Sequence, residues 1–243
     1  MGKSALVIPA RRGSTRLPDK LLLNAGDKPV IAHTVENCLR VRNVDRVLVV
    51  CDDEIFQNVL KDYPVEVILT PTDLQSGSDR VAYGVKDLDF EFIVNVQGDE
   101  PLLDPVDIER VVEELNYSQV VSLYYPIKEE EEYLNPNLVK VVLDKDSYAL
   151  YFSRSPVPFY RKLEFSRLKA FGYPLKHIGV YGYRKEILME FSFNMRKTSI
   201  EDIEKLEQLR LLYNQYKIKM LKASRDTIGI DTKEDFDKFC TLL

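Results

Sequence analysis

Short runs of β-branched and other apolar residues recur through the first half of the chain, separated by stretches with helical periodicity. The runs lie at residues 5–10, 47–51, 65–69 and 92–96. The helical stretches lie at residues 29–42, 53–61, 79–85 and 105–115. Strands that alternate with helices favour a parallel sheet, and right-handed crossovers place helices on both of its faces. The sequence therefore predicts a three-layer α/β sandwich around a mainly parallel, twisted sheet.

The second half of the chain predicts a smaller inserted lobe. Residues 139–143 and 148–152 flank a polar turn and predict a hairpin. Residues 156–173 are aromatic, basic and irregular, which is typical of a substrate loop or a subunit contact. The remaining expected elements are a strand at 177–183, a long helix at 200–216, a strand at 218–221 and a helix at 233–239. Because no linker divides the chain, we expect one domain over 1–243 with a lobe at about 139–183.

Several classes of protein are disfavoured by composition. No apolar run approaches the roughly 18 residues of a membrane helix, and the N-terminal run is too short for a signal peptide. Three widely spaced cysteines and two histidines argue against a zinc site and for a reducing compartment. The net charge of −5 argues against a general nucleic-acid binder. We expect a cytoplasmic protein with no membrane insertion and no nucleic-acid partner.

Positive charge is concentrated at the start of this acidic chain. Residues 1–20 carry five cations and one aspartate, a net +4, which leaves −9 for the remainder. Four of these cations lie in the loop 11–20, directly after the first expected strand. Ligands of open parallel sheets bind beyond the carboxyl ends of the strands. The loop therefore predicts a site for an anion, although a solvated basic loop is the alternative.

The residue types in this loop suit phosphate. Arginine forks match phosphate oxygens, and a lysine supplies a mobile point charge. Gly13 permits close approach of the backbone, and Ser14 offers a hydroxyl. The loop matches neither the P-loop pattern nor the dinucleotide-binding glycine pattern. We interpret it as a phosphate-binding loop of another kind.

Two aspartates follow expected strands near this loop. Asp99 follows the strand 92–96, and Asp231 follows a short apolar run. Magnesium takes few protein carboxylates and fills its remaining positions with phosphate and water. The alternatives are a turn residue before Pro101 for Asp99 and a helix N-cap before Thr232 for Asp231. The sequence alone favours the helix cap for Asp231.

One glutamate lies at an unusual position. Glu207 shares the helical face of Ile203 and Leu211. A carboxylate on an apolar face is expected either to form an ion pair or to have a functional role. The alternative to a functional role is an ion pair with Arg210, three residues later. Ser76 and Ser78 are plausible helix caps in the segment 75–80.

Seven blocks in this order carry a resemblance to a known family. They are IPARRGSTRLPDK at 8–20, QSGSDR at 75–80, VNVQGDEP at 94–101, YALYFSR at 148–154, HIGVYGY at 177–183, EKLEQLR at 204–210 and GIDT at 229–232. Together they resemble the 3-deoxy-manno-octulosonate (Kdo) cytidylyltransferases and span nearly the whole chain. The resemblance implies a nucleotide-diphospho-sugar transferase-like fold and a homodimer. It also implies transfer of CMP from CTP to the anomeric hydroxyl of Kdo for lipopolysaccharide synthesis, with release of pyrophosphate.

The resemblance also assigns roles to residues. It implies CTP contacts from Ala10, Arg11, Gly13, Ser14, Arg16, Lys20, Ser76, Gly77, Arg80 and Gln97, and Kdo contacts from Gln97, Arg154, His177, Tyr181 and Glu207. It makes Asp99 and Asp231 the ligands of Mg²⁺, and Arg11, Lys20 and the two aspartates the catalytic set. The alternatives are a cytidylyltransferase for 8-amino-Kdo or a sialic acid, and a nucleotide-binding regulator without catalysis.

Overall fold

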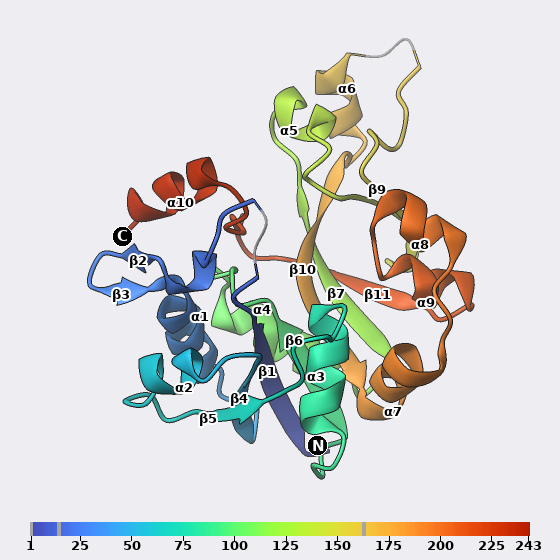
Figure 1. Ribbon diagram of the computed structural model, residues 1–243. Helices are drawn as coiled ribbons and strands as arrows, with labels where there is room; N and C mark the ends of the chain where they lie inside the picture. The colour runs from blue at the N-terminus through green and yellow to red at the C-terminus, as the bar shows by residue number, and fades with distance from the viewer. Residues whose placement is uncertain (1, 14–15, 162–163) are drawn as a thin grey trace.

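The computed structural model describes residues 2–13, 16–161 and 164–243 and is built around one large sheet (Figure 1). Its main path runs β11-β7-β10-β6-β1-β4-β5. These strands are β1 Ser4–Ala10, β4 Arg46–Cys51, β5 Glu66–Leu69, β6 Phe92–Val96, β7 Val120–Pro126, β10 Leu175–Arg184 and β11 Ile218–Lys222. Strands β6, β1, β4 and β5 are mutually parallel, as are β11 and β7, whereas β10 is antiparallel to both of its neighbours. The prediction of a mainly parallel sheet is confirmed, with one reversed strand near its middle.

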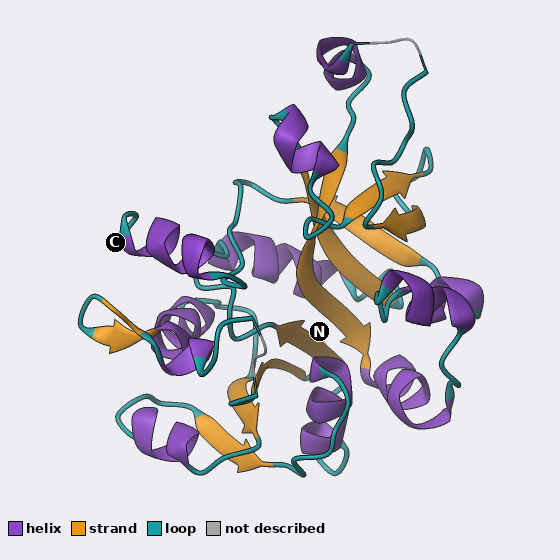
Figure 2. Cartoon of the chain, turned by 45° about the horizontal axis from the view of Figure 1, so that its top comes forward, coloured by secondary structure: helices purple, strands orange, loops and turns teal. Residues whose placement is uncertain are grey.

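Helices cover both faces of the sheet (Figures 1 and 2). One face carries α1 Val30–Leu39, α2 Ile55–Val59, α4 Pro105–Glu114 and α10 Lys233–Cys240, and the other carries α3 Gly77–Val85, α7 Lys185–Met189 and the π-helix η2 Glu190–Asn194. All seven residues of β1 are buried, with Leu6 and Ile8 in one core layer and Ala5 and Val7 in the other. This alternation follows from the two-residue period of a strand. The three-layer prediction is confirmed.

Polar residues begin several helices. Ser76 accepts a hydrogen bond from Asp79 N at 3.1 Å and caps α3, whereas Ser78 lies inside the helix. Thr232 caps α10 through a reciprocal box with Asp235. The cap of α10 is therefore Thr232, and the alternative that assigned this role to Asp231 is wrong.

The predicted hairpin is present as β8 Lys140–Leu143 and β9 Ala149–Ser153, and β8 also pairs with β10. Helices α5 Glu130–Leu134 and α6 Phe165–Ala170 project beyond it at the top of Figure 1. A small separate core of Ile127, Tyr133 and Leu168 lies between them. The segment 156–173 is thus partly helical rather than wholly irregular. The single-domain division with a lobe at 139–183 stays a prediction.

The long helix expected at 200–216 is wrong. The chain forms α8 Ser199–Glu204 and α9 Leu209–Tyr213, separated by Lys205 in the left-handed conformation (φ 54°). Ile203 is 80% exposed and Glu207 lies outside both helices, so the apolar stripe inferred around Glu207 does not exist. Helical spacing missed the break because no glycine or proline marks it.

The remaining elements are short. They are the 3₁₀ helix η1 Lys20–Leu22 and the two-stranded hairpin of β2 Asn24–Ala25 with β3 Lys28–Pro29. Of the helices in the described ranges, none combines the length and apolarity needed to cross a bilayer.

Candidate active site

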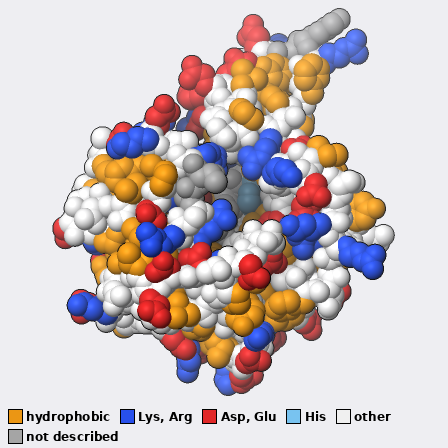
Figure 3. Space-filling view, viewed as in Figure 1, with side chains coloured by type: hydrophobic (Ala, Val, Ile, Leu, Met, Phe, Trp, Pro, Cys, Tyr) orange, Lys and Arg blue, Asp and Glu red, His pale blue; other side chains and the backbone are white. Residues whose placement is uncertain are grey.

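A cavity of about 600 Å³ opens at the carboxyl ends of β1 and β6. In the space-filling view, Lys and Arg side chains surround a hollow on this face of the molecule (Figure 3). The cavity is lined from one side by the end of β1, the loop to η1 and the start of α3. From the other side it is lined by the segment between α8 and α9. Ligand binding at this edge is the expectation for an open α/β sheet.

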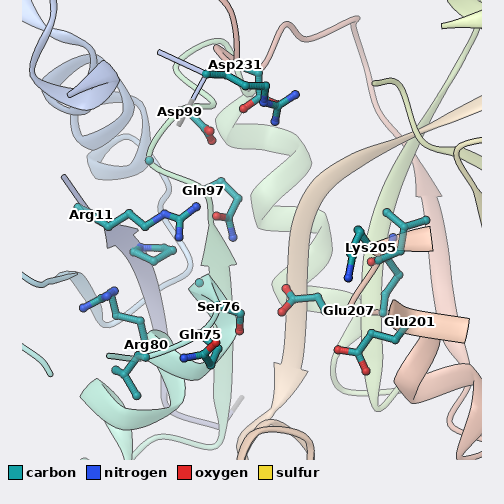
Figure 4. A pocket seen from close by; sticks show the side chains of 18 of the residues that line it. Arg11, Gln75, Ser76, Arg80, Gln97, Asp99, Glu201, Lys205, Glu207 and Asp231 are labelled. Atoms are coloured by element: carbon teal, nitrogen blue, oxygen red, sulfur yellow. The ribbon is translucent and has the colours of Figure 1, made fainter. Parts of the chain in front are cut away.

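Most of the predicted site residues meet in this cavity. Its lining includes Ala10, Arg11, Arg16, Lys20, Ser76, Gly77, Arg80, Gln97, Asp99, Arg154, Glu207 and Asp231. Gly13, His177 and Tyr181 are outside this lining, and Ser14 lies outside the described residues. Figure 4 shows Asp99 beside Asp231 and, lower in the cavity, Glu207 directed toward Ser76.

Lys20 joins the two aspartates. Its Nζ donates to Asp231 Oδ1 at 2.8 Å and to Asp99 Oδ2, and Arg16 forms an ion pair with Asp231 at 2.9 Å. Burial opposes the charge on Lys20, but the two carboxylates raise its pKa overall. The pKa of Asp231 is lowered, because Lys20 and Arg16 outweigh its own burial. The pairing of Lys20 with Asp231 therefore favours the charged forms of both groups.

The two carboxylates are suitable ligands for a hard divalent cation. Asp99 and Asp231 already converge on one positive group, the Lys20 ammonium. Carboxylate oxygens supplemented by phosphate and water form the usual Mg²⁺ environment. Groups of three or more metal-ligating side chains are absent from the part of the chain that the structure describes. The two carboxylates fit a metal ion whose remaining ligands come from phosphate and water.

Tight packing defines the side of the cavity at α3. A Cβ atom on Gly77 would lie 3.1 Å from Gln97 Oε1, so glycine permits the close approach of these two segments. Arg80 is buried and donates to Thr70 Oγ1 at 2.5 Å and Pro71 O at 3.1 Å. Its guanidinium also lies 3.5 Å from Asp52, although burial lowers its pKa. Arg80 therefore stabilises the wall of the cavity.

Glu207 reaches across to α3 rather than pairing with Arg210. Its Oε1 accepts from the Ser78 hydroxyl at 2.7 Å, while its buried Oε2 has no partner among the described residues. Burial raises the pKa of Glu207, and the nearby Ser78 and Ser76 hydroxyls act against that rise. The carboxylate that forms an ion pair with Arg210 is instead that of Glu201. An unpartnered buried carboxylate oxygen beside a cavity is suited to accept a ligand hydroxyl.

A line of hydrogen bonds links Glu207 to Gln97. Gln97 Nε2 donates to Asn95 Oδ1 at 3.1 Å, and Asn95 Nδ2 donates to Ser78 Oγ at 3.4 Å. Ser78 then donates to Glu207. Neither Ser78 nor Asn95 was assigned a site role from the sequence, although both lie within or beside the family-like blocks 75–80 and 94–101.

Arg154 binds backbone carbonyls at the break between α8 and α9. Its Nε donates to Glu204 O at 2.9 Å, and its NH2 group donates to Lys205 O at 3.4 Å. Its NH1 group donates to Pro136 O at 3.1 Å. The side chain lines the cavity and also holds the chain reversal that carries Glu207.

His177 and Tyr181 lie on β10 next to the cavity lining. His177 Nε2 is 3.0 Å from Ser122 Oγ, and its ring packs against Phe152 and Tyr181, each at 5.2 Å between centroids. Burial lowers the pKa of His177 to about 3, so the ring is neutral at pH 7. Burial raises the pKa of Tyr181, whose hydroxyl has no partner among the described residues. Contacts of these two residues with the sugar stay predictions, and a neutral imidazole would serve as a hydrogen-bonding group rather than a cation.

Part of the cavity lining is not predicted from the sequence. The additional polar residues are Gln75, Lys197, Glu201, Asp202, Lys205 and Gln208. Gln75, Lys205 and Gln208 fall inside family-like blocks, which was the available signal. Nothing in the local pattern marks Lys197 or Asp202, because the folding of α8 over the cavity brings them there.

Comparisons with known proteins agree with this architecture. The family model described as Cytidylyltransferase matches residues 5–218. A 3-deoxy-manno-octulosonate cytidylyltransferase of Trichlorobacter lovleyi is 41% identical over 96% of this chain and 95% of its own. The solved structure of a CMP:2-keto-3-deoxy-manno-octonic acid synthetase complexed with CTP is 35% identical and superposes with a TM-score of 0.89, covering 99% of this chain and 98% of that one.

A more distant structure shares the fold alone. The 4-diphosphocytidyl-2C-methyl-D-erythritol synthase of Anaerococcus prevotii superposes with a TM-score of 0.67 at 15% identity, covering 99% of this chain and 97% of that one. The full-length similarity of the nearer relatives is much higher than this fold-level likeness. The chain belongs to the 3-deoxy-manno-octulosonate cytidylyltransferase family of nucleotidyltransferases.

Proposed function

We propose that the protein transfers CMP from CTP to the anomeric hydroxyl of Kdo and releases pyrophosphate. One observation carries the proposal: a cluster of Arg16, Lys20, Asp99 and Asp231 and the unpartnered carboxylate oxygen of Glu207 lie in the same cavity (Figure 4). The first suits a triphosphate and its counter-ion, and the second suits a polyhydroxylated sugar. Support also comes from the relatives named for this reaction and from the similar structure that binds CTP.

Positioning and charge account for the chemistry. The sugar hydroxyl attacks the α-phosphorus in line and loses its proton to water, while the bond from the α-phosphorus to the bridging oxygen breaks and its electron pair leaves with pyrophosphate. Arg11, Arg16 and Lys20 offset the charge of the triphosphate and of the leaving pyrophosphate. Gln97, between the two ends of the cavity, holds both substrates in register. No covalent enzyme intermediate is needed.

Asp99 and Asp231 are the proposed holders of Mg²⁺. An ion held there would supply charge neutralisation at the reacting phosphate and would lower the pKa of the attacking hydroxyl. Lys20 then exchanges its two carboxylate partners for phosphate oxygens. Arg16 stays beside Asp231 and orients that carboxylate.

The proposal also includes the cellular compartment, the subunit assembly and the use of the product. All three cysteines are free thiols, with Cys38 and Cys51 buried, which suits the cytoplasm. We expect a homodimer formed through the lobe 139–183, and we expect CMP-Kdo to feed lipopolysaccharide synthesis.

Pyrophosphate release tests the function directly. The purified protein is mixed with CTP, Mg²⁺ and one of Kdo, 8-amino-Kdo or a sialic acid. Rapid release with Kdo, and slower release with the other two sugars, is the expected result. Preference for another sugar would favour the first alternative, and CTP binding without release from any sugar would favour the nucleotide-binding regulator.

A further inference from the structure

A buried ion pair between Glu201 of α8 and Arg210 of α9 connects the two helices across the break at Lys205. Arg210 Nε donates to Glu201 Oε2 at 2.8 Å and its NH2 group donates to Oε1 at 2.5 Å. The two side chains are only 4% and 8% exposed. Both oxygens of Glu201 are therefore engaged by one guanidinium, although Glu201 belongs to the cavity lining.

The same two residues bind three neighbouring segments. Arg210 NH1 donates to Phe191 O at 3.0 Å, and the guanidinium lies 4.3 Å from the centre of the Phe191 ring. Glu201 also completes the capping box of α8 with Thr198. The pair thus joins the start of α8, the π-helix η2 and α9.

Backbone hydrogen bonds connect this pair to the segment that carries Glu207. Leu206 N donates to Glu201 O at 3.3 Å, and Arg210 N donates to Glu207 O at 3.1 Å. The chain reverses between them at Lys205, in the left-handed conformation. The backbone of each partner of the ion pair is therefore hydrogen-bonded to the segment that carries Glu207.

Stability alone is a weak reason for such a pair. Apolar residues of similar volume often replace a buried ion pair with no loss of stability, because both charges must be desolvated. A bidentate arginine fork does provide a defined mutual orientation, which apolar packing and lysine do not. Since Glu207 Oε2 must reach a ligand while Oε1 stays on Ser78, orientation is the property that this segment requires.

We propose that the Glu201–Arg210 pair positions Glu207 for the sugar substrate. Both are positioning residues, acting through the segment 205–208 rather than by contact with the reacting atoms. The proposal rests on the proposed function, because it requires Glu207 to bind the sugar.

Steady-state kinetics of three variants test the idea. Arg210→Lys keeps the charge and loses the fork, and Glu201→Leu combined with Arg210→Met replaces the pair by apolar packing. Glu207→Gln is the reference for loss of the sugar contact. We expect each to raise the KM for Kdo by about tenfold or more, the effect of one weakened hydrogen bond to a charged group, while the KM for CTP changes less than about twofold.

A matched control breaks an ion pair elsewhere. Lys233→Met removes the exposed pair with Asp237 on α10 and should leave both KM values unchanged. Thermal unfolding of every variant reports stability separately, and the apolar double variant decides the outcome if Arg210→Lys unfolds.

The outcomes separate the two proposals. A Kdo defect in Glu207→Gln with normal Kdo kinetics in the double variant would overturn the positioning role alone. Normal Kdo kinetics in Glu207→Gln would overturn the sugar contact of Glu207 and with it the positioning role, whereas the turnover itself would still support transfer of CMP to Kdo. An equal rise of both KM values in the double variant would also contradict positioning, because it would show a general disturbance of the cavity.

Discussion

Lys20 Nζ lies 2.8 Å from Asp231 Oδ1 and also donates to Asp99, so one ammonium group joins the two carboxylates proposed to hold Mg²⁺. The lysine and the metal ion cannot both occupy this position. A nucleotide resolves the conflict, since its phosphates offer Lys20 another partner. In the proposed mechanism, the two aspartates therefore become fully available to Mg²⁺ only when the triphosphate binds.

Lys20→Met is therefore expected to strengthen metal binding in the absence of nucleotide. Removing the competing ammonium leaves two carboxylates without their shared cation, and we expect the Kd for Mn²⁺ to fall by about tenfold, as measured by electron paramagnetic resonance titration. The same variant should lose kcat, because the triphosphate loses a cation. Lys28→Met, which breaks a distant pair with Glu36, is the control. Equal Mn²⁺ affinity in the wild type and Lys20→Met would refute the competition.

Asp99→Ala should lower turnover by about two to three orders of magnitude while the fold survives. Asp99 lies in a turn after β6, outside the hydrophobic core, and Lys20 retains Asp231 as a partner. We expect kcat to fall by about 10²–10³-fold, the scale seen when one electrostatic contact to a transition state is lost. The rate of pyrophosphate release measures the loss of turnover, and circular dichroism shows whether the fold survives. Near-normal turnover would remove Asp99 from the catalytic set.

Ser78→Ala should weaken sugar use and shift its pH dependence. The Ser78 hydroxyl lowers the pKa of Glu207 against the effect of burial, so its removal raises that pKa further. The acidic limb of the kcat/KM profile for Kdo should then move to higher pH, because Glu207 stays protonated over a wider range. Loss of one buried hydrogen bond should also cost about 1 kcal/mol of stability, measured by urea unfolding.

The control for this experiment is Ser118→Ala. Ser118 donates to Glu114 at 2.8 Å beyond the end of α4 and lines no part of the cavity. It should lower stability by a similar amount and leave the pH profile in place. An unshifted profile in Ser78→Ala would contradict the link between Ser78 and the sugar site.

The first four strands of the large sheet were predictable because each coincides with a short apolar, β-branched run in the sequence, including the edge strand β5, which is not buried. The antiparallel β10 between β6 and β7 was not, since strand order depends on pairings distant in the sequence. The break at Lys205 was missed because tertiary contacts hold it, among them the bonds of Arg154 to the Glu204 and Lys205 carbonyls. Helical periodicity contains no information about such contacts.

The candidate site was also only partly predictable from the local sequence. The basic loop 11–20 was readable as an anion site from local charge alone. The meeting of Lys20 with Asp99 and Asp231 was expected only through family resemblance, since 132 positions separate the two aspartates. The true partner of Arg210 is Glu201, nine positions away, because the break lets α9 turn back against α8.

His177 provides a test of stability against pH. Its pKa is about 3 in the folded protein, whereas an ordinary histidine has a pKa of about 6.5. Below pH 6.5 the unfolded chain binds a proton that the folded protein does not, so stability falls as the pH falls toward 3. Between pH 7 and pH 5 this amounts to at most about 2 kcal/mol. Urea unfolding of the wild type should show this loss of stability in addition to the effects of other titrating groups. The variant His177→Gln should lack it. The same pH dependence in both proteins would mean that the imidazole is not held neutral against Ser122 and Phe152.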